Sequence, residues 1–537
     1  MFPVLRRRKG VRAAAAGAAL SVLAALTGCG ADGVGRAAPG PDGGSFSIGV
    51  PAWYVAHLTP GRAGKSSVAD AIWTPLTRID DRGQAVGAVA QSVRSSDLRH
   101  WTIELRHGWT FHNGEPVTAR SFADAWNAAA YGPNAMPYGY LFSDIQGYTD
   151  LNPLKGKPKR TTLSGVRAVD ARTLKVTLSR PLSVFPYTLA STVFAPMPKT
   201  AFKDLAGFDR LPIGNGPYEV AAPGIKPGVQ QLTLRRYDGY AGPEGSAARI
   251  TVKSYQDDAT AFTSFQSGAV DVALASGSRL AQARRTDADD VALSTAGGVV
   301  YLGFPLWDKR FRDRRVRQAF SLAINRHAVT RSLLQGLASP AAGIAPDTVT
   351  GGGQRACADC RYDPTRARRL LSEAGGWHGR LTLWTQADPA MQTVLEAVLN
   401  QLRTNLGITS ITLEAQPTDQ LYPNLSAHKA DGPFLLYMGA SYPALYAQAQ
   451  QLFTTGSGTN TTGYRSGTFT SLLDRAAAAR TTPRITALTR RAERTALDDL
   501  PLAPLYHPVT GAVHGPDLTG VHLDFLGDVQ LARISVR

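Results

Sequence analysis

Short runs that alternate apolar and polar residues recur along this chain, and segments with helical periodicity separate them. Trp101–Leu105 alternates at period two, which is typical of a half-buried strand. Leu381–Thr385 and Phe434–Tyr437 are further strand candidates, and Met391–Leu406 between them has the length and periodicity of a helix. No segment repeats at a period of about 20 to 50 residues, which excludes a repeat architecture. The pattern predicts a mixed α/β fold.

Residues that cap helices mark where the predicted helices begin. Such N-caps are predicted at Thr118, Asp313, Asn325 and Asp363. Pro364 follows the last of them at the first helical position, where proline is favoured. The helix after Asn325 is expected to end at Gly336, and the first strand is expected at Ser45–Val50. With 537 residues, the chain is too long for one ordinary core, so two or three lobes are expected.

The first residues have the order of a secretory signal. Five basic residues are followed by a small, apolar run that ends at Leu26 and is shorter than the ~20 residues that cross a bilayer. Leu26-Thr27-Gly28-Cys29 resembles a bacterial lipobox, in which the cysteine becomes the lipidated first residue of the mature chain. The sequence therefore predicts a signal peptide over residues 1–28 and a lipid on Cys29. This lipid would hold the protein on the extracytoplasmic face of the cell membrane.

Residues 29–44 are rich in glycine and proline and lack large apolar side chains. Such a composition cannot bury enough surface to order itself, so it predicts a flexible tether. The alternative is an ordinary cleaved signal with an incidental cysteine.

Composition and charge describe a globular protein with a basic surface. Apolar residues make up 43% of the chain and charged residues 18%, and no later segment is apolar enough to span a membrane. Five of the 58 basic residues lie in the signal region, which leaves 53 against 41 acidic residues, a net charge of +12. Because the basic residues are spread along the chain, we expect a solvated surface beside an anionic membrane, and no nucleic-acid partner.

Two cysteines remain besides Cys29, spaced C-A-D-C at Cys357 and Cys360. Outside the cell a disulfide is the default for such a pair. A zinc site would need four ligands, and a redox motif would place its first cysteine at a helix N-terminus. The pair therefore predicts a local disulfide.

Seven segments of the mature chain follow one another in the order of a known family. They are Leu98–Ala119 (LRHWTIELRHGWTFHNGEPVTA), Pro212–Tyr218 (PIGNGPY), Phe265–Asp271 (FQSGAVD), Arg315–Ala319 (RVRQA), Tyr362–Pro364 (YDP), Gly463–Leu473 and Pro501–Tyr506. Together, behind a lipobox, they resemble the extracytoplasmic solute-binding proteins of oligopeptide and dipeptide ABC importers, family 5. The similarity covers about residues 45–530.

The resemblance implies a type II periplasmic-binding-protein-like fold with two lobes, a hinge and a third subdomain. By analogy, the base lobe combines residues 45–76, 187–296 and 505–537, the extra subdomain is 77–186, and the second lobe is 300–504. Hinge strands are expected near 297–303 and 500–506. The resemblance also implies a monomer that encloses a peptide-like solute and delivers it to a permease with its ATPase subunits, without a cofactor or metal.

Four places are expected to contact the solute. Aromatic side chains that can stack on it are Trp53 and Tyr54 after the first strand, Trp307, and Trp384. The fourth place comprises Tyr437, Gly439, Ala440, Ser441 and Tyr442. For each aromatic side chain the alternative is packing in the core or an incidental surface position.

At Ser441 this chain departs from the family pattern. Peptide-binding relatives carry an aspartate there, which pairs with the α-ammonium of the peptide. A buried ammonium without an opposing charge is costly. Asp388, in the segment after Trp384, is a candidate to compensate, but the segment lacks the arginine that some dipeptide binders use for the peptide carboxylate. We therefore expect a modified or longer peptide, or another hydrophilic solute, in place of a simple zwitterionic dipeptide.

Motifs for catalysis are weak. Gly64-Lys65-Ser66 resembles the end of a phosphate loop, but Thr59 stands where the first glycine belongs. His107 and His112 have poor spacing for a shared metal, and paired acids such as Asp257-Asp258 are typical of solvated helix ends. The chain is therefore not expected to be an enzyme. A sensor lipoprotein that binds solute without transport and a surface hydrolase remain as alternatives.

Overall fold

The computed structural model describes residues 43–153, 155–225, 231–243, 245–286 and 288–537. The predicted signal peptide, Cys29 and nearly all of the tether lie outside the described residues. Within the described ranges, every helix is too short or too polar to cross a bilayer.

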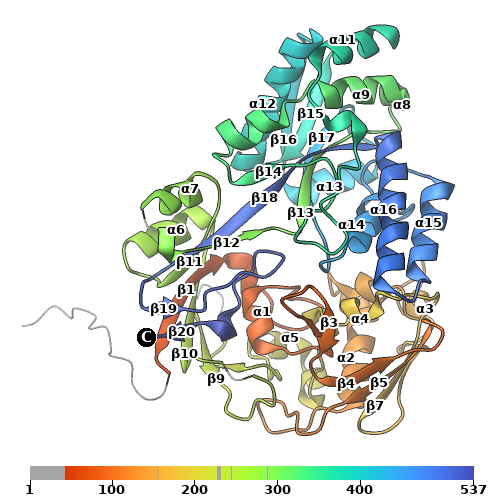
Figure 1. Ribbon diagram of the computed structural model, residues 1–537. Coiled ribbons are helices and arrows are strands. Elements are labelled where there is room, and N and C mark those ends of the chain that lie inside the picture. The colour runs from red at the N-terminus through yellow and green to blue at the C-terminus, as the bar shows by residue number, and fades with distance from the viewer. Residues whose placement is uncertain (1–42, 154, 226–230, 244, 287) are drawn as a thin grey trace, which may run out of the picture. The chain divides into compact units, whose positions relative to one another are not determined.

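A 12-stranded mixed sheet runs through the described chain (Figure 1), which confirms the predicted α/β class. Its order is β16-β15-β17-β13-β18-β11-β1-β10-β9-β8, and β12 and β14 both pair with β18. The strands are β1 (Ser45–Pro51), β8 (Tyr218–Val220), β9 (Gln231–Arg236), β10 (Arg249–Tyr255), β11 (Val272–Ala275), β12 (Val291–Thr295), β13 (Gly298–Gly303), β14 (Ala338–Pro340), β15 (Leu381–Gln386), β16 (Ile411–Gln416), β17 (Phe434–Gly439) and β18 (Leu502–His514).

The 13-residue strand β18 joins two sections of this sheet. Its first half pairs with β13 from Leu502 to Tyr506, and its second half pairs with β12 from Val509 to Val513. We call β1, β8 to β12 and the second half of β18 the first section. We call residues 298–506, which contain β13 to β17 and the first half of β18, the second section. The chain crosses between the sections at 296–297 and again near Pro508, so the expected hinge strands themselves lie within the second section.

The helices of the second section are α8 (Lys309–Arg312), α9 (Arg314–Leu322), α10 (Arg326–Ala328), α11 (Pro364–Glu373), α12 (Pro389–Leu406), α13 (Thr418–Ser426), α14 (Leu445–Phe453), α15 (Gly467–Ala477) and α16 (Thr482–Asp499). Three of them, α9, α10 and α11, begin after the N-caps that the sequence predicts. Asp313 and Asp363 accept hydrogen bonds from backbone amides in the first turns of α9 and α11, at 2.8 and 3.0 Å. Asn325 caps α10, but this helix passes into a π-helical turn at Val329–Leu333 and ends before Gly336.

A separate four-stranded antiparallel sheet lies under α2 (Ala119–Ala130). Its order is β4 (Ala90–Arg94), β5 (His100–Leu105), β7 (Thr173–Thr177) and β6 (Val166–Ala168). Thr118 caps α2, as the sequence predicts, and Ser121 completes a reciprocal capping box with it. Trp126 on this helix is fully buried and donates its indole N–H to the carbonyl of Phe194 at 2.9 Å.

The remaining elements are short. They are α1 (Ser67–Ile72), β2 (Thr77–Ile79), β3 (Ala85–Gly87), α3 (Tyr148–Leu151), α4 (Phe185–Thr188), α5 (Leu205–Arg210), α6 (Asp258–Gln266), α7 (Gly277–Thr286), β19 (Leu518–Thr519) and β20 (Ser535–Val536).

His112 and the PIGNGPY segment pack on each other beside α1. The Nδ1 atom of His112 accepts from the amide of Gly214 at 3.1 Å, and burial lowers the pKa of this imidazole to about 4. A Cβ on Gly216 would lie 2.4 Å from the backbone carbon of Ile72, so only glycine fits this approach. His112 is thus a structural side chain, whereas His107 is exposed beside Arg172.

Cys357 and Cys360 are joined by a disulfide, and the loop between them presents a buried carboxylate. Asp359 is 4% exposed and accepts from the amide of Gln318 at 2.7 Å. It also pairs with Arg314 of α9 at 3.5 Å and Arg366 of α11 at 3.3 Å. The C-A-D-C loop therefore fastens α9 to α11.

A second buried carboxylate predicts a pH-dependent stability. Glu493 on α16 is 1% exposed; one oxygen accepts from Ile344 N at 2.9 Å and the other has no partner among the described residues. Burial raises its pKa from 4.5 to about 7, so the folded state keeps a proton that the unfolded state loses between these values. The free energy of unfolding should therefore fall as pH rises through this window, by up to ~3 kcal/mol.

Glu493→Gln keeps the acceptor for Ile344 and removes the titration. We expect its free energy of unfolding to exceed that of the unchanged protein by up to ~3 kcal/mol at about pH 8 and by little at about pH 5. Urea denaturation at both pH values measures this difference. Glu396→Gln, at an exposed position on α12, is the control. An equal pH dependence for both variants would contradict the assignment.

Candidate functional site

Two aromatic side chains stand at the C-terminal end of β1. Trp53 is 56% exposed and Tyr54 is 5% exposed, and their rings meet edge to face at 4.2 Å. The hydroxyl of Tyr54 donates to a carboxylate oxygen of Asp528, far along the sequence. The hydrogen bond to Asp528 therefore fixes the position of Tyr54, whereas the indole ring of Trp53 is exposed to solvent.

Lys65 and three carboxylates support Tyr54. The Nζ atom of Lys65 lies 2.5 Å from Asp70 Oδ2, contacts Asp524 Oδ2, and lies 3.9 Å from Asp528 Oδ2. The other oxygen of Asp524 accepts from the amides of Leu526 and Asp528, at 2.8 and 3.0 Å. Burial raises the pKa of Asp528 to about 7, against the opposing effect of the Lys65 charge.

This network also settles the role of Gly64-Lys65-Ser66. The ammonium of Lys65 is fully engaged by protein carboxylates, so it does not serve as a phosphate ligand in this arrangement. Sequence reasoning missed Asp524 and Asp528, because they lie more than 450 positions from Lys65 and have no local pattern except a turn at Gly527.

The second element of the site is the end of β17. β13 pairs with all six residues of β17, whereas β15 pairs only with Phe434 and Leu435. Residues 436–439 therefore have no partner strand on that side among the described strands. Burial raises the pKa of Tyr437 to about 12, and the charge of Asp528 adds to this effect. Asp528 thus bonds the Tyr54 hydroxyl directly and acts on Tyr437 through its charge.

The segment after β17 turns away from the sheet. The amide of Ala440 donates to Gly297 at 2.9 Å, where the chain crosses between sections. Ser441 is exposed, and its hydroxyl accepts from the side-chain amide of Gln451 on α14. Tyr442 is 6% exposed, and its ring packs 5.7 Å from that of Tyr187 on α4. Ser441 is therefore the exposed polar group of this segment.

Trp307 and Trp384 do not join these residues. Trp307 stacks on His428 at 4.5 Å and donates to the carbonyl of Ala430 at 3.0 Å. Trp384 donates to Asp431 at 3.2 Å and stands beside Phe434. Both indoles therefore lie at the opposite end of β17, about 17 Å from Gly439 along the strand. The order of the residues in the sequence does not show which of these aromatic side chains lie at which end of β17.

Comparisons with known proteins agree with this architecture. The family described as bacterial extracellular solute-binding proteins, family 5 (middle part), matches residues 84–463. The oligopeptide-binding protein OppA of Bacillus subtilis is 25% identical over 496 residues, covering 88% of this chain and 89% of the relative. A dipeptide-binding protein of Lactococcus lactis is 26% identical over 502 residues, covering 86% and 88%.

The likeness extends to solved structures. The murein tripeptide-binding protein MppA of Escherichia coli superposes with a TM-score of 0.77 at 22% identity, over 92% of this chain and 98% of that structure. This similarity confirms the fold class expected from the sequence.

The Lys65 network predicts a strong effect of removing its cation. Lys65→Met leaves Asp70, Asp524 and Asp528 without an opposing charge, so we expect a loss of about 3–5 kcal/mol in the free energy of unfolding at about pH 8. The loss should be smaller at about pH 5, because protonation of the carboxylates relieves their repulsion. Chemical denaturation measures it, with exposed Lys309→Met as the control. A loss no larger than that of the control would show that the network does not stabilise the fold.

Proposed function

Because this chain belongs to family 5 of the bacterial extracellular solute-binding proteins, we propose that it captures a peptide-like solute and delivers it to an ABC importer. The relatives named for oligopeptide and dipeptide binding are similar over more than four-fifths of the chain, which supports this class of solute. The function is capture and release, so the site needs complementary surfaces and no catalytic group.

The unpaired edge of β17 carries the proposal. An extended peptide can add to an exposed strand edge through main-chain hydrogen bonds, which need no particular side chain in the peptide. Residues 436–439 lack a partner strand on one side among the described strands, Tyr437 and Gly439 are half-buried there, and Tyr54 bonds Asp528 from the other section of the sheet. Trp53 would stack on the bound solute from the other section of the sheet.

The enclosing units would be those expected from the family. The base lobe would comprise residues 45–76, 187–296 and 505–537, with the extra subdomain at 77–186 and the second lobe at 300–504. Solute would stabilise closure because it contacts Trp53 on one side and the β17 edge on the other.

Ser441 defines the expected chemistry of the solute. Its hydroxyl is engaged by the neutral amide of Gln451, and the segment holds no carboxylate. Desolvating a free α-ammonium here would be uncompensated. The solute is therefore a modified or longer peptide whose amino end is uncharged or lies outside this position.

The proposed function also suits a protein that is anchored to the membrane. The lipid on Cys29 would keep the monomeric protein at the extracytoplasmic face of the cell membrane, near its permease. A tether raises the effective concentration of loaded protein at its partner.

Isothermal titration calorimetry tests the Ser441 proposal. We expect unmodified dipeptides to bind weakly, and Ser441→Asp to tighten their binding by about tenfold or more through a charge-assisted hydrogen bond. N-acetylated peptides should gain nothing from this substitution. Ser372→Asp, on the exposed face of α11, is the control for added charge. Tight binding of unmodified dipeptides by the unchanged protein would refute the proposal.

Cell fractionation tests the anchor. Cys29→Ser should move the protein from the membrane to the soluble fraction, because the thiol that accepts the lipid is gone. Its solute affinity should stay unchanged, since Cys29 precedes every residue assigned to the site. Retention of the substituted protein on the membrane would disprove the lipid anchor.

A further inference from the structure

The hairpin of α15 and α16 carries an uncompensated basic surface. Residues 465–494 contain seven arginines, no lysine and two acidic residues, of which Glu493 is buried. Arg480 and Arg490 donate to the backbone carbonyls of Ser96 and Gly351. The other five are exposed and make no side-chain hydrogen bond or ion pair with the described residues: Arg465, Arg475, Arg484, Arg491 and Arg494.

Several exposed arginines elsewhere in the second section are paired with carboxylates. On α9 and α11, Arg315 lies 2.7 Å from Asp313 and Arg369 lies 3.8 Å from Glu373. Arg361, just before α11, lies 3.7 Å from Asp363. These arginines are equally exposed, so abundance of arginine alone does not distinguish the α15–α16 surface. What distinguishes this surface is that five exposed arginines without carboxylate partners among the described residues gather on or next to two packed helices.

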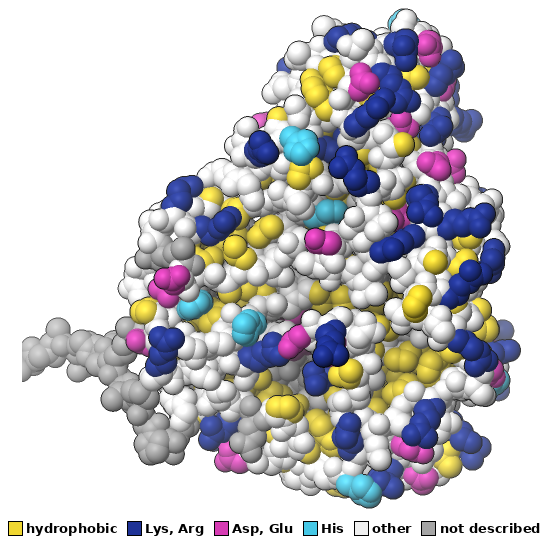
Figure 2. Space-filling view, viewed as in Figure 1, with side chains coloured by type: hydrophobic (Ala, Val, Ile, Leu, Met, Phe, Trp, Pro, Cys, Tyr) yellow, Lys and Arg dark blue, Asp and Glu magenta, His cyan; other side chains and the backbone are white. Residues whose placement is uncertain are grey.

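The arginines of α16 form one stripe. Arg484, Arg491 and Arg494 lie within about 80° of one another around the helix axis, at about 100° per residue. Figure 2 shows Lys and Arg side chains gathered over α15 and α16 on the right of that view. The two helices pack against each other, so the stripe lies one helix away from the exposed face of α15.

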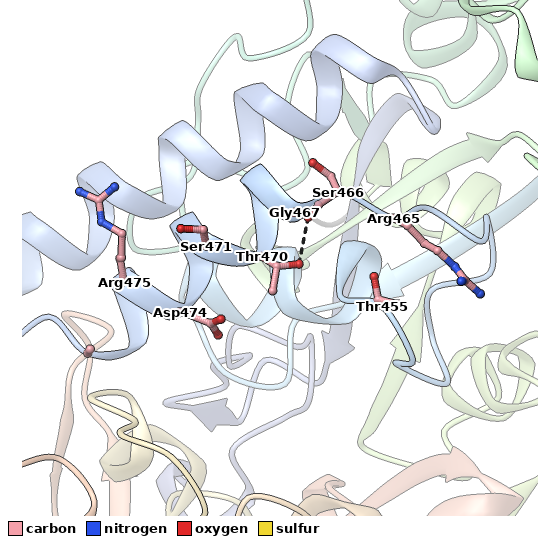
Figure 3. Close-up of a pocket in the computed structure, with 9 residues that line it drawn as sticks. Thr455, Arg465, Ser466, Gly467, Thr470, Ser471, Asp474 and Arg475 are labelled. Carbon is pink, nitrogen blue, oxygen red and sulfur yellow. Dashed lines mark hydrogen bonds between the residues drawn. The ribbon is translucent and has the colours of Figure 1, made fainter.

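A groove of about 810 Å³ runs along this exposed face of α15. Figure 3 shows Arg465 and Arg475 at opposite ends of a row that contains Ser466, Thr470 and Ser471. The two arginines are ten residues apart, which is about 15 Å along a helix. About five residues of extended polypeptide span that distance.

One carboxylate lies in the groove but is already engaged. Asp474 lies 3.5 Å from Arg180, which also lies 3.1 Å from Asp144. Next to it, the amide of Ser183 donates to the carbonyl of Ala477 at 2.7 Å. The segment before α4 therefore lies beside the Arg475 end of the groove, where Arg180 opposes the charge of Asp474.

We propose that the α15–α16 surface docks an acidic, extended segment of a partner protein. The arginines supply bidentate partners for carboxylates about four residues apart, and the free hydroxyls of Thr455 and Ser471 can bond the intervening backbone. This groove is shallow and open, and the spacing of its two end cations matches a short extended polypeptide. The residues that line this surface are different from those of the β17 edge.

The binding of a synthetic acidic peptide tests the proposal. The probe is a fluorescein-labelled peptide of alternating glutamate and serine, titrated with the full-length protein and followed by fluorescence anisotropy. The combined variant R465Q/R475Q/R491Q should bind at least about tenfold more weakly, because its three unpaired cations are gone. The matched control R315Q/R361Q/R369Q loses the same charge from paired positions and should change affinity by less than about twofold.

Two outcomes overturn the proposal. Equal weakening in both triple variants would show that net charge alone attracts the peptide. Unchanged peptide binding in R465Q/R475Q/R491Q, with loss of binding to phosphatidylglycerol vesicles, would assign the surface to the membrane. Thermal unfolding of each variant establishes that it is folded. Titration of the same samples with solute separately measures binding at the β17 edge.

Discussion

The hydrogen bonds of β18 carry the architecture. This single strand pairs with β13 and β14 in its first part and with β12 and β11 in its second, so the two sections of the sheet share one continuous backbone. A strand that is paired on both sides leaves few backbone groups unsatisfied, which makes its path costly to alter. The second section, from Gly298 to Tyr506, is inserted between two neighbouring strands of this ladder. The end of β1, the start of β13 and the C-terminal turn consequently meet at one place.

Buried charged side chains fix the positions of the segments that meet there. Lys65 alone faces three carboxylates, and the turn that supplies Asp524 and Asp528 also accepts the amide of Gly297 at 2.7 Å through the carbonyl of Phe525. The network thus ties the C-terminal turn to the crossing between the sections. Such buried pairs add little net stability compared with apolar packing, but they specify one arrangement, because any other leaves a charge without a partner. Tyr54 takes its position from this network.

Local features of the sequence predicted local structure well. Thr118, Asp313 and Asp363 cap helices because a side-chain oxygen meets amides only two or three residues away. The α/β class and the strands around Trp101 and Phe434 follow from periodicity for the same reason. The site was harder, because its parts come from distant segments. Trp307 and Trp384 share the aromatic character of Trp53 but stand at the far end of β17, and only the pairing register separates them. The partners of Lys65 depend on tertiary contacts that no local pattern encodes.

The insertion of the second section has a mechanical consequence. Only two stretches of chain connect Gly298–Tyr506 to the rest, and they run side by side because β13 and β18 are paired neighbours. Two adjoining connections resist stretching and sliding but permit bending about the line through them. Such a pair of connections would restrict a relative movement of the two sections to nearly one angular coordinate. A single label pair placed across β17 and Trp53 would follow the whole movement, and its full range would be limited by how far the Ser183 and Ala477 backbones can separate.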